Sequence, residues 1–136
     1  MIDYEVDIYD AVVTAVQTAL PDETISFDAD WIKSPAVLPH VQISETNNYT
    51  DERSQQADVG DRFAVVTYDV NIYTNDISGK KLHARRILGA IDEAFTALNF
   101  RRVQQDVVPN LSDATVYRIM ARYRAMVGND GTLYRR

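Results

Sequence analysis

Basic and aromatic side chains recur near the C-terminal end of the sequence at a spacing that suits binding. If this stretch forms a strand, Arg118, Arg122 and Arg124 lie on one face, and Tyr117 and Tyr123 lie on the other. Arginines that hold phosphates and tyrosines that stack on bases make a platform for nucleic acid. The same two residue types are enriched in protein interfaces. A third interpretation is a solvated outer face, and the residues alone leave all three open.

The stretch Ser-Gly-Lys-Lys at residues 78–81 resembles part of a phosphate-binding loop. The full motif needs a glycine five positions before the glycine–lysine pair, where Thr74 stands, and a Ser or Thr after the lysine, where Lys81 stands. The alternative is a turn followed by the start of a helix. Two residues that define a nucleotide site are missing, so we expect no such site here.

Metal and nucleophile chemistry is also weakly represented. His40 and His83 lie far apart in the sequence, and neither has a second histidine or a suitably spaced carboxylate beside it. The absence of cysteine excludes disulfides, thiolate ligands and cysteine nucleophiles, and it fits a reducing, cytoplasmic environment. We therefore expect no enzymatic activity, no catalytic residues, no bound metal and no cofactor.

Charge is unevenly distributed along the 136 residues, whose net charge is −6. Residues 1–78 contain 15 acidic and 3 basic residues, a balance of −12, whereas residues 79–136 contain 5 acidic and 11 basic residues, a balance of +6. An acidic surface of one copy could therefore meet a basic surface of the next, although a chance distribution over a solvated surface is the alternative. The overall acidic balance argues against a free nucleic-acid binder, which usually has a basic excess.

Length and composition fit one domain spanning residues 1–136, since 46% of the residues are hydrophobic. The longest charge-free run near the N-terminus, residues 11–21, has about half the length of a membrane span. It follows four acidic residues, whereas a signal peptide begins with basic ones. We expect a soluble protein that is not exported and has no membrane partner.

A strand followed by a helix organises the middle of the chain. In residues 62–74, Val66, Tyr68, Val70 and Ile72 alternate with polar residues, which is the pattern of a strand with one face on a core. After a turn rich in Asn, Asp, Ser and Gly, the apolar positions step by three and four, which predicts an amphipathic helix. Its apolar stripe comprises Ala84, Ile87, Leu88, Ile91, Ala94, Phe95 and Leu98. We expect the middle of this stripe to face the sheet.

The other elements complete the prediction. An N-terminal helix is predicted at residues 3–20, with Asp3 as its N-cap. Its apolar stripe comprises Val6, Tyr9, Val12, Val13, Val16, Ala19 and Leu20. Further strands are predicted at residues 24–27, 38–46, 99–108, 115–127 and 132–136. Residues 115–127 also fit a helix, but their alternation and β-branched content favour a strand. The result is an α+β fold, an antiparallel or mixed sheet of about four to five strands with two helices packed on one face.

A polar segment at residues 45–61 has almost no apolar content, so we expect a loop there. Loops of this length are uncommon in compact domains and are usually functional or disordered. The segment contains Asn48, Tyr49 and Arg53, and we expect limited proteolysis to cut near Arg53 in a free protomer.

Several stretches, taken in order, resemble one family. Residues 108–127 (VPNLSDATVYRIMARYRAMV) and 134–136 (YRR) resemble the C-terminal half of tail terminator, or tail completion, proteins of long-tailed phages of Gram-positive bacteria. The acidic N-terminal helix, residues 33–36 (KSPA), 48–50 (NYT) and 68–75 (YDVNIYTN) resemble the same family in the same order. Its members are often labelled minor capsid or head–tail joining proteins.

The resemblance implies a structural virion protein that forms a homo-oligomeric ring, usually a hexamer. Such a ring caps the tail tube and joins it to the head connector or stopper protein at the head–tail junction, after assembly in the host cytoplasm. Genomic DNA passes through it without sequence-specific binding. A head-completion or stopper protein on the connector side and a small nucleic-acid-binding domain are the alternatives. The candidate interface residues are Arg118, Arg122, Arg124, Tyr117, Tyr123, Asn48, Tyr49, Arg53, Lys80 and Lys81.

Overall fold

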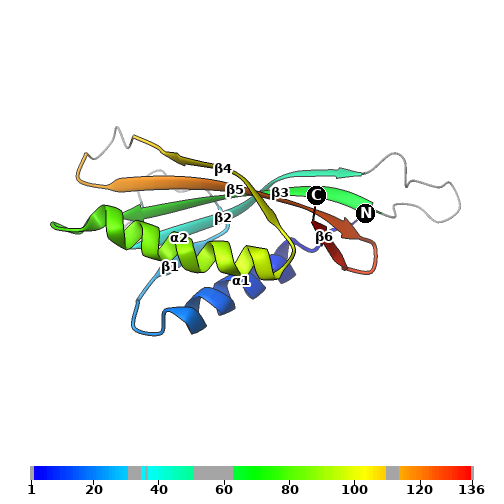
Figure 1. Cartoon of the computed structure of the whole chain (residues 1–136), viewed down its shortest axis with the longest axis horizontal. Coiled ribbons are helices and arrows are strands. Elements are labelled where there is room, and N and C mark those ends of the chain that lie inside the picture. Colours follow the sequence, from blue (N-terminus) through cyan, green and yellow to red (C-terminus); the bar gives the residue numbers. More distant parts are fainter. Residues whose placement is uncertain (1, 31–34, 36, 51–62, 110–113, 136) are drawn as a thin grey trace, which may run out of the picture.

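The computed structural model describes residues 2–30, 35, 37–50, 63–109 and 114–135, which form a sheet layer and a helix layer (Figure 1). In chain order the elements are α1 (Glu5–Ala19), β1 (Ser26–Asp28), β2 (His40–Thr50), β3 (Phe63–Thr74), α2 (Lys80–Ala97), β4 (Arg101–Val107), β5 (Tyr117–Gly128) and β6 (Leu133–Arg135). Both helices lie on the same face of the sheet and pack against each other. The predicted α+β class with two helices on one face is confirmed.

The sheet has six strands in the order β1-β2-β3-β5-β4, with β6 also paired to β5. β1 is parallel to β2, and the other pairs are antiparallel, so the sheet is mixed. β3 and β5 pair along their whole length, from Phe63 opposite Gly128 to Thr74 opposite Tyr117. The strand interpretation of residues 115–127 is confirmed.

The core lies between the helices and the sheet. The four apolar residues predicted for β3 are buried, as is the predicted stripe of α2 except for the half-buried Leu98. At its centre Phe95 stacks on Tyr123, with ring centroids 4.4 Å apart and ring planes 8° apart. Tyr68 and Phe100 pack around this pair at tilted and edge-on angles. These aromatic contacts join α2 to β3, β5 and the start of β4.

The start of α2 depends on Gly79, whose φ of 84° lies in the left-handed region that residues with a Cβ rarely adopt. The His83 N–H donates to the Gly79 carbonyl at 2.9 Å and closes the first turn. The turn-and-helix interpretation of residues 78–81 therefore describes this stretch. Within the part of the chain that the structure describes, neither helix is long and apolar enough to cross a membrane.

α1 is rotated about its axis relative to the predicted stripe. Its buried residues are Ile8, Val12 and Val16, whereas Val6 is 71% exposed. Val6 precedes Ile8 by two positions, which is about 200° around a helix of 3.6 residues per turn, so the two cannot face one layer. Assigning Val6 to the core was wrong because Ile8 begins the buried stripe.

The N-terminal end of α1 is fixed to the C-terminal hairpin. The N-cap position is Tyr4 and not Asp3 as predicted, although Asp3 Oδ1 accepts a hydrogen bond from the Glu5 N–H at 3.3 Å. Tyr4 donates its hydroxyl proton to the Asn129 carbonyl at 2.9 Å. A Cβ at Gly131 would lie 3.1 Å from the Tyr4 ring, so glycine permits this close approach.

β2 is longer than predicted. It pairs with β3 as far as Thr50, opposite Ala64, with one irregularity between Glu45 and Asn47. Residues 47–50 are therefore strand, and the loop prediction is wrong for them, whereas residues 45–46, where the two predicted segments overlapped, follow the strand prediction. Backbone pairing with β3 extends this strand without an apolar stripe, which is why the composition gave no signal. Residues 51–61 lie outside the described residues.

Candidate interface on the polar face of the sheet

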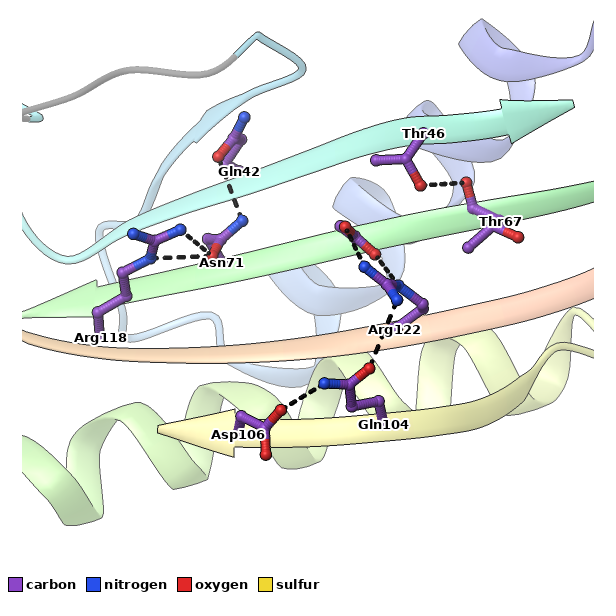
Figure 2. Close-up of polar contacts among 9 residues, drawn as sticks. Gln42, Thr46, Thr67, Asn71, Gln104, Asp106, Arg118 and Arg122 are labelled. Carbon is purple, nitrogen blue, oxygen red and sulfur yellow. Dashed lines mark hydrogen bonds and ion pairs between the residues drawn. The ribbon is translucent and has the colours of Figure 1, made fainter. Parts of the chain in front are cut away.

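The sheet face opposite the helices carries polar side chains, and we name it the polar face. Side chains alternate along a strand, so residues between the core positions point to this face. Its members include Gln42, Ser44, Thr67, Asp69, Asn71, Arg101, Gln104, Asp106, Arg118, Arg122 and Arg124. Figure 2 shows part of this face with the helices behind the strands, and dashed lines join polar groups of neighbouring strands. The three arginines predicted to share a face do share it.

Arg118 belongs to a hydrogen-bonded row across three strands (Figure 2). Its Nε and one terminal nitrogen donate to Asn71 Oδ1 at 3.0 and 2.9 Å, and Asn71 Nδ2 donates to Gln42 Oε1 at 3.4 Å. The guanidinium also lies over the Tyr73 ring, 5.5 Å from its centroid. Asn71 and Gln42 are buried, so these bonds satisfy polar groups that would otherwise be costly. Arg118 is thus largely committed within its own chain.

Arg122 forms an ion pair within the chain. Its Nε and a terminal nitrogen donate to the two carboxylate oxygens of Asp69 at 2.7 and 3.1 Å, and another donates to Gln104 Oε1 at 3.4 Å. Gln104 in turn donates to Asp106. The hydrogen bonds and charge of Asp69 raise the pKa of Arg122. The charge of Arg122, which was expected to bind a neighbouring subunit, is therefore already compensated by Asp69.

Arg124 differs from the other two arginines. It stands directly opposite Arg101, so two positive side chains face each other across β4 and β5. On its other side Arg124 is opposite Thr67, whose hydroxyl is buried without a hydrogen-bond partner among the described residues. Arg101 was not among the predicted interface residues, because its position opposite Arg124 follows from strand register and not from sequence spacing.

The two predicted tyrosines lie on the helix side of β5. Tyr123 is 1% exposed and donates its hydroxyl proton to Asp92 Oδ1 at 2.9 Å. Burial, followed by the charge of Asp92, raises the pKa of this hydroxyl. Tyr117 is half-buried, and its hydroxyl is buried without a partner among the described residues. Tyr123 is therefore excluded from the candidate interface. A stacking platform would need the tyrosines and the arginines on one surface, and Tyr117 and Tyr123 lie on the other side of β5 from the arginines.

The remaining predicted residues are scattered. Asn48 Nδ2 donates to the Ile2 carbonyl at 2.9 Å, which ties β2 to the N-terminal end, while Tyr49 is 59% exposed. Lys80 Nζ donates to the Thr115 carbonyl at 3.2 Å, and Lys81 is exposed.

Three predicted residues meet at a surface pocket. This pocket of about 350 Å³ lies between the start of α2 and the facing ends of β4 and β5. Its lining includes Lys80, Tyr117 and Arg118 together with Val107 and Val116. Arg53 lies outside the described residues.

His83 has two carboxylates beside it that its sequence neighbours do not reveal. Its Nε2 lies 2.6 Å from Glu23 Oε2, and its Nδ1 lies 2.9 Å from Asp76 Oδ1. A neutral imidazole has one N–H, so donating to both carboxylates requires the protonated ring. Burial lowers the pKa of His83, but the hydrogen bonds to Asp76 and Glu23 outweigh it and raise the pKa overall. His83 therefore links the start of α2 to Glu23 and Asp76 as a structural clamp.

Three carboxylates that were not predicted to share a site form a cluster. Oxygens of Asp3, Glu5 and Glu45 all lie within 4.8 Å of one another. Tyr68 donates its hydroxyl proton to Glu45 Oε1 at 3.3 Å. Burial raises the pKa of Glu45, and the charges of Glu5 and Asp3 raise it further. Among the described residues this is the one group that could hold a cation. Asp3 and Glu5 lie far from Glu45 along the chain, so no local pattern could reveal the cluster.

Comparison with solved structures finds the same fold in a virion. The chain matches a protein chain of the virion of the native gene transfer agent (GTA) particle with a TM-score of 0.57 and 18% sequence identity. The match covers 88% of this chain and 93% of that chain. No family model matches the sequence. The search of curated proteins finds no match either. The likeness therefore establishes a shared fold over nearly the whole length of both chains.

Proposed function

We propose that this chain is a structural virion protein that forms a ring, caps the tail tube as a tail terminator, and joins it to the head connector. The observation that carries the proposal is the fold match over 88% of the chain to a component of a gene transfer agent virion. A fold can host many functions, so the match supports the class of protein and leaves the exact position in the virion to other arguments.

The sequence resemblance supports the finer part of the proposal. The stretches that resemble tail terminator proteins include residues 108–127 and 68–75, and these cover most of β5 and the second part of β3, the paired strands at the centre of the sheet. Resemblance and fold therefore concern the same scaffold. The proposed role is mechanical: the ring covers the growing end of the tube and offers a new surface to the head.

The polar face supports a binding role over catalysis. Its hydrogen bonds run between side chains of the same chain and order the surface, as an interface that must keep its shape requires. Arginine at such a surface is typical of protein interfaces. The tyrosines needed for base stacking lie on the other side of β5, so a protein partner is favoured over single-stranded nucleic acid.

Electron microscopy of purified virions with an antibody against this chain tests the proposed position. The expected result is one label site per particle, at the head–tail junction. A capping assay on purified tail tubes complements it, since added protein should bind one tube end and stop further elongation. Label along the tail shaft or within the capsid shell would contradict the terminator role while leaving a structural virion role in place.

Titration with a labelled oligonucleotide tests the nucleic-acid alternative. Binding driven by phosphate contacts falls steeply as salt rises. We expect no saturable binding at moderate salt, because the net charge of −6 repels a polyanion. Tight, salt-dependent binding would favour the alternative function.

A further inference from the structure

The pair formed by Arg101 and Arg124 is an uncompensated charge at one edge of the sheet. Arg101 lies on β4, the last strand in the sheet order, and pairs directly with Arg124 on β5. Neither guanidinium has a hydrogen bond or an ion pair with the residues that the structure describes, whereas Arg118 and Arg122 are satisfied within the chain. Like charges directly opposite each other destabilise a sheet. The isolated chain therefore carries a positive site that no described residue compensates.

The carboxylate cluster of Asp3, Glu5 and Glu45 is its negative counterpart at the other edge. β1 pairs with β2 only as far as Gln42, so β2 is an edge strand at Glu45. The three carboxylates crowd one another within 4.8 Å, and Tyr68 donates a hydrogen bond to one of them. No described cation lies in ion-pair contact with the cluster. The arginine pair and the carboxylate cluster therefore each carry charge that a surface of opposite sign would stabilise.

The two clusters lie at nearly the same level of the sheet. Glu45 is opposite Tyr68, and the preceding residue of β3, Thr67, is opposite Arg124. They occupy opposite edges, and they also occupy opposite faces, since Tyr68 points to the core and Thr67 to the polar face. They cannot meet within one chain. Two different surfaces at opposite edges are the arrangement that head-to-tail contacts in a ring need.

We propose that the Arg101–Arg124 pair of one copy binds the Asp3–Glu5–Glu45 cluster of the next copy. This joint rests on the proposed ring-forming function, and it names the residues that would close the ring. Guanidinium groups bind carboxylates with two parallel hydrogen bonds, so two arginines can engage a crowded carboxylate cluster with directional contacts. The joint relieves like-charge repulsion on both sides at once. A second copy carries the opposite charge for both the arginine pair and the carboxylate cluster. A polyanion could bind the arginine pair alone.

Charge reversal at the arginines is the first test. The double variant Arg101→Glu, Arg124→Glu keeps a like-charge pair at the same two positions. Repulsion within this pair should therefore destabilise the fold about as much as it does in the wild type. Its edge now repels the acidic cluster. The association constant, measured by light scattering over a concentration series, should fall at least about tenfold. Circular dichroism checks the fold, and Arg85→Glu, an exposed arginine on α2, is the matched control that should assemble normally.

Charge exchange makes the test specific. The variant Asp3→Lys, Glu5→Lys should also fail to assemble alone, because its cluster now repels the arginines. An equimolar mixture of this variant with Arg101→Glu, Arg124→Glu has complementary charges at every joint when the copies alternate. Assembly in the mixture should return to within about threefold of the wild type. Variants that assemble like the wild type, or a mixture that does not recover, would overturn the proposed joint.

Cysteine cross-linking gives a second readout, since the chain has no cysteine of its own. A chain carrying both Glu5→Cys and Arg124→Cys should form a ladder of disulfide-linked oligomers under oxidation, because each copy reacts at two different surfaces. Each single-cysteine variant has no cysteine on the facing surface of the next copy, so it should give no ladder and at most a nonspecific dimer. The proposal is overturned if the wild type stays monomeric at high concentration and the double variant gives no ladder.

The outcomes separate this joint from the proposed function. Antibody labelling at the head–tail junction together with unaffected charge variants would mean that the ring uses another interface. An oligonucleotide that binds the wild type and is lost only in the Arg101→Glu, Arg124→Glu variant would mean that the pair binds phosphate instead, and it would also overturn the joint.

Discussion

The two faces of the sheet are stabilised by different interactions. The helix-covered face removes apolar side chains from water, and its centre is the stack of Phe95 on Tyr123. The polar face is ordered by hydrogen bonds between side chains, such as those from Arg118 to Asn71 and from Arg122 to Asp69. A change in side-chain volume should destabilise the helix-covered face, and the loss of a hydrogen-bond partner should destabilise the polar face. The first face thus depends on packing and the second on specific hydrogen-bond partners.

The largest effect is expected from removing an aromatic ring on the helix-covered face. Phe95→Ala should lower the free energy of unfolding by about 3–5 kcal/mol, because the side chain is fully buried and its removal leaves a cavity. Urea denaturation with an unchanged slope measures the loss. Leu82→Ala on the same helix is the control, since Leu82 is 75% exposed and should change stability by less than about 0.5 kcal/mol. Equal effects of the two variants would mean that the layers are packed differently.

A smaller loss is expected from breaking the row on the polar face. Asn71→Ala removes the acceptor for Arg118 and the donor to Gln42, so it should destabilise by about 1–3 kcal/mol. Asn71→Asp should recover part of the loss, because a carboxylate can still accept from the guanidinium. If Asn71→Leu were as stable as the wild type, apolar burial and not hydrogen bonding would be what this face needs.

The clamp at His83 adds a pH-dependent contribution on the helix side. Its folded pKa is raised, so the stabilisation is fully present below the unfolded value of about 6.5 and is lost as pH rises through the folded pKa. The carboxylates of Glu23 and Asp76 must stay ionised, so the effect should be largest between about pH 5 and 6.5. His83→Gln should cost about 1 kcal/mol there and less at alkaline pH, measured as the difference in unfolding free energy. A difference that stays the same from this range up to alkaline pH would show that the ring carries no extra proton in the folded state.

The smallest expected effect has the opposite sign. Arg124→Gln relieves the repulsion with Arg101, so it should raise the free energy of unfolding of the monomer by about 0.2–1 kcal/mol at low salt. The gain should shrink as salt screens the charges. Thermal denaturation at two salt concentrations measures both. A loss of stability would mean that Arg124 makes a favourable contact within its own chain.

Much of the helix-covered face could be predicted from the sequence. The alternation in β3 and the three–four spacing in α2 each place one apolar side, and two such sides can bury only each other. The rotation of α1 could not be fixed in the same way. Both Val6 and Ile8 begin apolar series with helical spacing, and only packing against α2 and the sheet decides which series is buried.

Less of the polar face was predictable. The common face of Arg118, Arg122 and Arg124 follows from alternation alone, because alternate residues of any strand point the same way. Their partners depend on strand register, which the sequence does not state: Asp69 and Arg101 lie far from Arg122 and Arg124 along the chain. The end of β2 was missed because its polar residues are held in the sheet by backbone pairing with β3.

The hydrogen bond from Tyr4 to the Asn129 carbonyl joins residues 125 positions apart. Contacts between distant parts of a chain form late, because a long segment must first be ordered. Tyr4 emerges from the ribosome early, but its ring can pack only after the hairpin around Gly131 has been synthesised. The first helix therefore docks completely only after β5 and β6 have been synthesised, so a nascent chain should remain sensitive to proteases at its N-terminal end until these two strands have emerged.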